Sequence, residues 1–410
     1  MTSIPIRTTA PLAPGQLPSW EEQMRLLLPV GQQLIDNWGR SEYSEEDKQD
    51  QWVLGLAMLA GGYLGHVYMD PKRPVFVPYW NIALNQGGPN PDYIYNYTAI
   101  DPEGTYRISG FRGTNRFTEF SQTHRRVFYM LEEARNSAPI TNDLDQLQLG
   151  PNGEFSVILS PERPEGHEGD WWRLGEDTQS IIVRRCSTDW RGEVDSRIAI
   201  ERLDPVETAT WSDVSQRWSE LPQWIVGMVK FMTDLVKWYR ENHPTNGLEL
   251  SKKITQIGGL PNQFYYDGIY QIDDDEALVV EVRIPSPCHY WQILVADDRF
   301  CTVDWLNRQS SLNDKQARLD ADGMLRVVVS KQDPGVPNWL DKEDNKSGIL
   351  QMRFNRAKEA PGQGHPGQAG RRAPAPAGRY PRGHAGGTQA HPLCAPRGRP
   401  AEDLLVRDCA

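Results

Sequence analysis

Cysteine is scarce in this sequence, and its spacing excludes the usual structural uses of the residue. Five cysteines occur in 410 residues, and two of them lie beyond residue 361. The other three, Cys186, Cys288 and Cys301, form neither an even disulfide set nor a CxxC metal pair. We therefore expect buried, reduced thiols and a cytoplasmic location.

Long apolar runs and excess positive charge are also lacking. The longest apolar run, Val53–Met69, contains two adjacent Gly and falls short of the ~18–20 residues that span a bilayer. The start, MTSIPIRTTAPLAPGQ, has no apolar signal segment. The net charge of -11 argues against nucleic acid or an anionic membrane as the main partner. We expect no nucleic-acid binding and no membrane span.

The motifs of the common enzyme classes are absent. There is no GxSxG elbow, P-loop, HExxH or dinucleotide fingerprint. The acidic runs 167–170 and 273–276 lie in loop-like segments and lack the ligand spacing of known metal sites. The sequence therefore predicts neither a metal nor an organic cofactor.

Aromatic residues, by contrast, are plentiful, with 14 Trp and 15 Tyr. Short β-branched and aromatic runs alternate with Gly, Pro, Asn and Asp over residues 75–204, and again over residues 261–356. This pattern predicts a mainly β protein with helical additions, built on two antiparallel β-sandwich-like domains.

Helical periodicity fills the other parts of the body. Residues 19–72 predict a helical lead segment, and residues 207–245 predict a long amphipathic helix between the β-domains. The Pro-rich residues 1–18 are expected to be loosely ordered. One apolar stripe of the lead segment consists of Val53, Ala57, Ala60, Leu64 and Val67.

One signature of a turn followed by a strand occurs three times. It reads IDPEGTYRIS at 100–109, LGPNGEFSVILS at 149–160 and LDADGMLRVVVS at 319–330. Each copy places Gly in a tight turn, where it tolerates positive φ, directly before a strand. Because copies occur in both β regions, the sequence predicts that the two β-domains are related.

The tail, residues 361–410, differs in composition from everything before it. It holds eight Pro and nine Gly, and it has no Lys or Ile. Such a segment cannot bury a core, so the sequence predicts a disordered low-complexity tail. Two explanations stay open: a frameshift in a GC-rich gene, and a native disordered tail.

Two polar clusters follow predicted strands of the second β-domain. Asp304, Arg308 and Asn313 belong to the first cluster, and Asp341 belongs to the second. A carboxylate, a guanidinium and an amide gathered at a strand end suit acid–base chemistry, so these four are the candidate catalytic residues. The alternative is a turn network in which Asp304 pairs with Arg308 and Asn313 caps a short helix.

Aromatic side chains and one arginine are candidate ligand contacts. Together they would line a cleft for a hydrophobic small molecule, with ordinary strand packing as the alternative. The candidate ligand-binding residues are Tyr93, Tyr95, Arg112, Tyr266, Trp291 and Trp339.

Several of these stretches, taken in order, resemble a known family. NPDYIYNYTAIDPEGTYRISGFRG, CHYWQILVADD, DWLNRQSSLNDKQARLDADG and DPGVPNWLD are similar to the bacterial family called domain of unknown function 1214, over residues 75–355. The resemblance implies β-sandwich layers and a place among genes that handle steroids, terpenoids and aromatic compounds. It also implies a His after NWLD, which residues 342–348 lack, so a reaction that depended on this His would be lost here.

Two functions stay open at this point. One is an enzyme without a cofactor, a lyase, isomerase or hydrolase, acting on a terpenoid, steroid or aromatic compound in secondary metabolism or catabolism. The other is a non-catalytic binding or scaffolding protein for the same kind of ligand. The sequence does not decide between an enzyme and a binding protein, and it leaves a homo-oligomer open.

Overall fold

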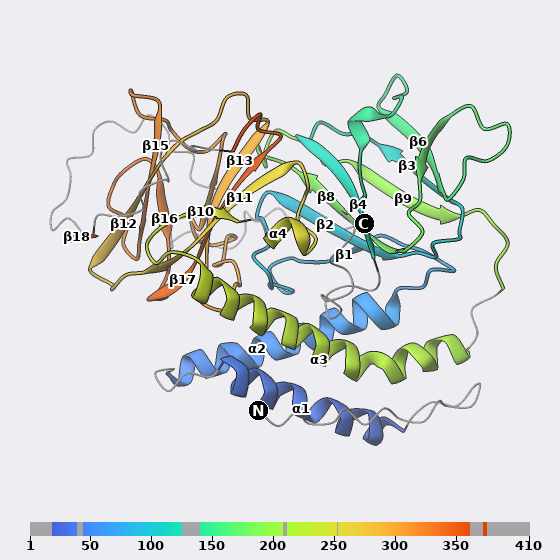
Figure 1. Cartoon of the computed structure of the whole chain (residues 1–410), viewed down its shortest axis with the longest axis horizontal. Coiled ribbons are helices and arrows are strands. Elements are labelled where there is room, and N and C mark those ends of the chain that lie inside the picture. Colours follow the sequence, from blue (N-terminus) through green and yellow to red (C-terminus); the bar gives the residue numbers. More distant parts are fainter. Residues whose placement is uncertain are drawn as a thin grey trace, which may run out of the picture.

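The computed structural model describes residues 19–38, 44–124, 140–207, 211–251, 253–360 and 372–374. Two β-sandwiches lie side by side, and the long helices run along one side of both (Figure 1). The predicted fold class is confirmed, because the chain is mainly β, with a helical segment at its start and one long helix between the β regions. Residues 1–18 and most of the tail lie outside the described residues.

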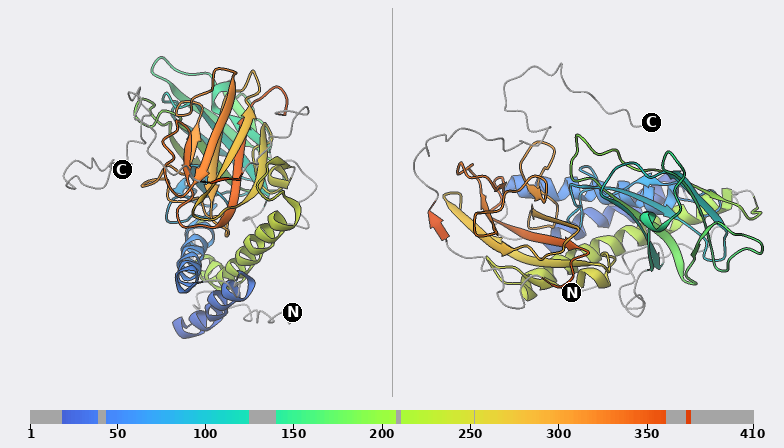
Figure 2. Two further views of the ribbon diagram at one scale, coloured as in Figure 1. Left: turned by 90° about the vertical axis from the view of Figure 1, so that its left-hand side faces the viewer. Right: turned by 90° about the horizontal axis from the view of Figure 1, so that it is seen from above.

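The three long helices gather below the sandwiches, as the side view in Figure 2 shows. A capping box begins α2, because Ser44 Oγ accepts the N–H of Asp47 and the Asp47 carboxylate accepts the N–H of Ser44. None of the described helices is long and apolar enough to cross a membrane. The helices are α1 (Trp20–Trp38), α2 (Glu45–Gly62, continued by a π-helical turn Tyr63–Tyr68), α3 (Trp211–Asn242) and α4 (Lys253–Gln256).

The first sandwich consists of two sheets that enclose a core. Tyr106, Val157 and Val183 are among the side chains buried between them. One sheet has the order β1 (Val77–Pro78), β2 (Tyr93–Ala99), β8 (Thr178–Cys186), β4 (Phe117–His124) and β5 (Ile140–Asp143). The other has the order β7 (Asp170–Arg173), β6 (Glu154–Ser160), β3 (Tyr106–Phe111) and β9 (Arg197–Arg202).

The second sandwich is built in the same way around Val280, Val327 and Met352. One sheet has the order β10 (Glu249–Ser251), β11 (Gln263–Gln271), β17 (Ser347–Asn355), β13 (Tyr290–Ala296) and β14 (Ser311–Asn313). The other has the order β16 (Trp339–Asp341), β15 (Met324–Ser330), β12 (Glu276–Arg283) and β18 (Arg372–Pro374).

The two sandwiches have the same topology, strand for strand. Replacing β1 to β9 by β10 to β18 in the strand orders of the first sandwich reproduces those of the second. The direction of pairing is also the same: among the described strands only β6–β7 and β15–β16 run parallel, and every other pair is antiparallel. Identical order and direction over nine strands identify a tandem repeat of one fold.

Local contacts repeat as well. Trp171 Nε1 donates to Ser160 Oγ at 3.0 Å in the first repeat, and Trp339 Nε1 donates to Ser330 Oγ at 3.1 Å in the second. Both Trp–Ser pairs join the parallel strands. The turn-and-strand signature at 149–160 and 319–330 therefore marks equivalent positions, β6 and β15, of the two repeats.

The buried face of α2 differs from the one expected. Val53 is 64% exposed, whereas Leu54 and Met58 are buried in the core that α2 shares with α3. Gly62 lies so close to α3 that a Cβ there would come within 2.7 Å of Ile225 Cγ1. The expected stripe is therefore wrong at its start, whereas its last member, Val67, is buried in this core. Close packing of glycine, rather than apolar periodicity alone, decides which face of α2 meets α3.

Three residues of the predicted disordered tail form a strand. In β18, Ala373 pairs antiparallel with Ala277 of β12. The prediction of disorder is therefore wrong for Arg372–Pro374. An edge strand binds through backbone N–H and C=O groups, so a low-complexity side-chain composition does not prevent the pairing.

Candidate functional site

The four candidate catalytic residues do not form one centre. The Asp304 carboxylate accepts the backbone N–H of Leu306 at 3.0 Å and the side-chain amide of Asn307 at 2.7 Å, both within its own turn. Arg308 instead forms ion pairs with Asp341 at 3.0 Å and with Glu343 at 2.7 Å. The structure therefore brings Arg308 and Asp341 together and leaves the Asp304 carboxylate occupied elsewhere.

Asn313 belongs to a third network, between the two repeats. It is fully buried, and its Nδ2 donates to Asp92 Oδ1 at 2.8 Å and to the carbonyl of Thr188 at 3.1 Å. Its Oδ1 accepts the backbone N–H of Lys315 and of Gln316, so it caps a turn rather than the expected short helix.

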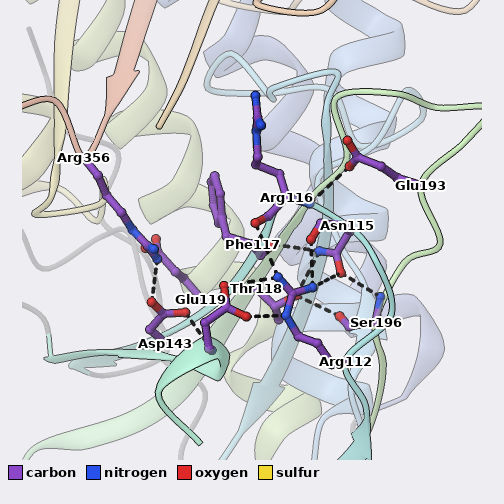
Figure 3. A network of polar contacts seen from close by, with 11 residues as sticks. Arg112, Asn115, Arg116, Phe117, Thr118, Glu119, Asp143, Glu193, Ser196 and Arg356 are labelled. Carbon is purple, nitrogen blue, oxygen red and sulfur yellow. Dashed lines mark hydrogen bonds and ion pairs between the residues drawn. The ribbon is translucent and has the colours of Figure 1, made fainter. Parts of the chain in front are cut away.

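Four of the candidate ligand contacts have structural roles. Arg112 holds the start of a loop through Asp145 and through the carbonyl of Asn115, at 2.8 Å from the latter (Figure 3). Trp291 is buried in the core of the second sandwich, and Tyr266 packs edge-on against Phe354 in the same core. Trp339 makes the Trp–Ser contact described above.

The other two candidates, Tyr93 and Tyr95, line a cavity of about 120 Å³ between the two repeats. Helix α3 forms most of the apolar wall of this cavity, and the facing sheets of the repeats form most of the polar wall. The apolar wall includes Met228, Phe231, Met232, Leu235, Ile254 and Phe300. The polar wall includes Tyr95, Arg184, Tyr265, Arg353, Gln86 and Gln351.

A tyrosine–arginine pair in each repeat dominates the polar wall. Tyr95 lies opposite Arg184 in the β2–β8 register, and Tyr265 lies opposite Arg353 in the β11–β17 register. Because β2 corresponds to β11 and β8 to β17, the two pairs are equivalent in the repeat. The cavity is therefore lined by the same two side chains twice.

Each arginine binds the loop of the other repeat. Arg184 Nη2 donates to the carbonyl of Gly258 at 2.6 Å, and Arg353 Nη2 donates to the carbonyl of Gly88 at 2.6 Å. Gly88 has φ +62, and a Cβ there would come within 2.3 Å of Phe300, so this position requires glycine. These reciprocal contacts hold both guanidinium groups at the cavity.

Both tyrosine hydroxyls accept a backbone N–H from the segment before their strand. Tyr95 Oη accepts from Asn90 at 3.0 Å, and Tyr265 Oη accepts from Leu260 at 2.9 Å. Burial raises the pKa of both phenols, and the positive charges of Arg184 and Arg353 oppose this rise. Both hydroxyls therefore stay protonated at neutral pH and can donate.

Two glutamines at the cavity hold polar atoms without partners. Gln86 is 3% exposed, and neither its Oε1 nor its Nε2 forms a hydrogen bond within the part of the chain that the structure describes. Gln351 donates from Nε2 to Asp267 at 2.7 Å, but its Oε1 has no partner among the same residues. A buried amide without a partner is costly, so these atoms mark positions where a ligand or water would bind.

A buried carboxylate lies beside this interface. Asp92 accepts hydrogen bonds from Tyr290 Oη at 2.8 Å, Trp190 Nε1 at 2.9 Å and Asn313 Nδ2 at 2.8 Å. Burial raises the pKa of Asp92 to about 7, and these three donors oppose the rise. Since Tyr290 and Asn313 come from the second repeat, Asp92 ties the two sandwiches together.

Sequence reasoning did not identify Arg184, Arg353, Gln86 or Gln351. A signal was available in the segments 87–95 and 258–266, because an offset of 170 residues places Gly88, Pro91 and Tyr95 level with Gly258, Pro261 and Tyr265. Aligning these segments would have shown equivalent tyrosines. Within the described residues, no group of three or more His, Cys, Asp or Glu is placed to hold a metal ion.

Comparison with known proteins supports the expected family in part of the chain. Residues 271–359 match the model of the family described as "Protein of unknown function (DUF1214)". This match covers most of the second sandwich, and for residues 75–270 the resemblance stays a prediction. No curated protein matches the chain.

Two solved structures are similar to the chain. An uncharacterized protein from Burkholderia cenocepacia has a TM-score of 0.74 and 24% sequence identity, over 83% of this chain and 94% of that one. A protein from Vibrio parahaemolyticus has a TM-score of 0.41 and 12% identity, over 81% of this chain and 98% of that one. The first shows that the fold occurs elsewhere, and neither names an activity.

Proposed function

We propose that this protein binds a small, mainly apolar molecule in the cavity between its two repeats. The observation that carries the proposal is a cavity of about 120 Å³ with a wall of methionine and aromatic side chains. Protein interiors are close-packed, so a space of this size is unusual without an occupant. The unpartnered amide of Gln86 beside it supports the same conclusion.

The size of the cavity narrows the ligand classes expected from the sequence. An apolar cavity of roughly 150 Å³ is enough to bind benzene, and drug-sized ligands need about 300–1,000 Å³. A single aromatic ring or a short branched chain therefore suits this space. A steroid does not, unless the walls move apart.

The proposal is for binding rather than catalysis. Asp304, Arg308 and Asp341 do not line the cavity, and their charged groups are occupied by a turn or by one another. The enzyme hypothesis required these residues to form an acid–base centre at the ligand, and they do not lie at the cavity. A non-catalytic binding protein is the alternative that the geometry supports better.

The cellular context expected from the sequence remains part of the proposal. Cys186, Cys288 and Cys301 are free thiols, which agrees with a reducing cytoplasm. Bacterial origin and a role in catabolism or secondary metabolism are likewise proposed and rest on the family resemblance.

A thermal-shift screen with single-ring aromatics, C10 terpenoids and a steroid tests the proposal. A ligand that binds only the native state raises the melting temperature, and we expect this for the single-ring compounds. Met232→Trp should fill the cavity and abolish the shift. The matched control is Lys230→Trp, which adds the same side chain on the exposed face of α3. Equal shifts in both variants would contradict the proposal.

A further inference from the structure

The two cavity arginines are buried without a carboxylate partner. Arg184 is 8% exposed and Arg353 is 5% exposed. Neither forms an ion pair with any residue that the structure describes. A buried charge without a counter-ion is costly, and proteins usually pair it. Two such charges at one cavity therefore require an explanation.

The strand neighbours of the two arginines do not supply the missing charge. Glu119 lies opposite Arg184 in the β4–β8 register, but its Oε1 is bound by Arg356 at 2.9 Å and by Asn262 at 2.8 Å. The corresponding neighbour of Arg353 is the neutral Gln292, which accepts from Arg353 Nη1 at 2.9 Å. No Asp or Glu is among the described residues that line the cavity.

The arginines and tyrosines keep hydrogen-bond donors to offer. Each guanidinium has five N–H groups. Arg184 uses Nη1 on Ser121 and Nη2 on Gly258, and Arg353 uses Nη1 on Gln292 and Nη2 on Gly88. The hydroxyls of the equivalent tyrosines accept a backbone N–H and make no further hydrogen bond among the described residues, so each has its own proton to donate. Donors from both repeats thus surround one apolar cavity.

We infer that the ligand is a small monocarboxylate, whose carboxylate is held between Arg184 and Arg353 and whose apolar part rests on α3. This inference deepens the proposed function and depends on it. A carboxylate supplies the missing negative charge and accepts hydrogen bonds from guanidinium and phenol groups. The apolar wall and the small volume favour an aryl or short branched-chain acid over a phosphate, which has no apolar part to place there.

Matched ligand pairs test the inference. Benzoate and 4-methylbenzoate should bind at least about tenfold more tightly than their neutral amides, since a charged hydrogen bond adds more than 1.4 kcal/mol. Titration calorimetry of the full chain measures both. Arg353→Gln and Arg184→Gln should weaken binding of the acids far more than that of the amides, and so remove most of this preference. The control is Arg107→Gln, which removes an exposed arginine paired with Glu201 on the outer sheet.

The outcomes separate this inference from the proposed function. If neither acids nor amides bind, the proposed function fails. If acids and amides bind equally, the cavity binds apolar ligands and the inference is overturned. Inorganic phosphate that displaces benzoate completely would identify an anion site without selectivity for carboxylates, which also overturns it. Should an arginine variant not fold, the comparison of acid and amide on the wild-type protein decides alone.

Discussion

At the scale of single residues, the repeat is most evident in the two Trp–Ser pairs. Ser160 Oγ donates to the carbonyl of Glu162 at 2.7 Å, and Ser330 Oγ donates to the carbonyl of Gln332 at 2.8 Å. Each hydroxyl also accepts the indole N–H of its tryptophan. The serine hydroxyl suits both places because it accepts one hydrogen bond and donates another at once.

Replacing either serine by alanine should destabilise the protein. We expect Ser160→Ala to cost about 1–3 kcal/mol, because Trp171 then loses its acceptor. Ser330→Ala should cost less, since Trp339 keeps the carbonyl of Ser330 at 3.2 Å. Urea unfolding measures both, with Ser156→Ala on the exposed side of β6 as the control. A larger loss for Ser330→Ala would contradict the account.

Asp92 should make stability depend on pH. In the folded protein the pKa of the Asp92 carboxyl is about 7. The pKa of an aspartate in an unfolded chain is about 3.9. Between these values the folded state keeps a proton that the unfolded state has released, so stability falls as pH rises through this window.

The variant Asp92→Asn tests this prediction. Asn keeps the oxygen that accepts from Trp190 and Asn313 but cannot ionise. We expect the wild-type free energy of unfolding to fall more steeply between pH 5 and pH 7 than that of the variant, by up to about 1.4 kcal/mol per pH unit. Urea titrations at several pH values measure both slopes. Parallel slopes would show that Asp92 is ionised throughout.

At the scale of elements, close packing between α2 and α3 shapes the helical layer. The exposed face of α2 carries Trp52 at 59% and Leu56 at 63% exposure, whereas its buried face includes several glycines. Glycine is a poor helix former, so its use here indicates that the short distance to α3 matters more than helix propensity. The same helix α3 then forms the apolar wall of the cavity.

Adding one methyl group at this contact should be harmful. Gly62→Ala places a Cβ within 2.7 Å of Ile225 and 2.9 Å of Leu221. Overpacking of this kind costs typically ~1–3 kcal/mol, and it should outweigh the gain in helix propensity. Thermal unfolding measures the loss, with Leu56→Ala on the exposed face as a control that should change little. A stabilised Gly62→Ala would show that α2 and α3 can move apart.

At the scale of the whole molecule, ion pairs and hydrogen bonds cross between the repeats beside the cavity. Arg356, just after β17, binds Glu119 at 2.9 Å and Asp143 at 2.7 Å in the first sandwich (Figure 3). Arg116 of the first sandwich pairs in turn with Asp314 of the second. These contacts fix the facing sheets relative to each other and thereby set the width of the cavity.

A double-mutant cycle should reveal this coupling. Arg356→Gln leaves Glu119, which is fully buried, without its cation, and breaking such a pair costs roughly 3–5 kcal/mol. Glu119→Gln in the same chain should restore part of the loss, because Gln already occupies the equivalent position 292 of the second repeat. Urea unfolding of both single variants and the double variant measures the coupling energy. Additive losses would show that the two side chains act independently.

The sequence alone determined much of the secondary structure and the relation between the β regions. Alternating strand patterns, turn glycines and the helical period of residues 207–245 are local properties, and the structure confirms a mainly β fold with one long connecting helix. The signature at 149–160 and 319–330 marked equivalent strands for the same reason, since a turn followed by a strand is specified within about a dozen residues.

Only the tertiary structure decided which polar residues meet. Arg184 and Arg353 each lie within a strand of their own repeat, where an arginine is normally expected on the solvent side. Local geometry determines that alternate residues share a face, but what covers that face depends on how the two sandwiches and α3 pack. The packing of the sandwiches also decides which candidate residues meet. Asp304 and Asp341 were expected to share one site, but each has its own partners. Tyr95 and Tyr265, from different repeats, line the same cavity.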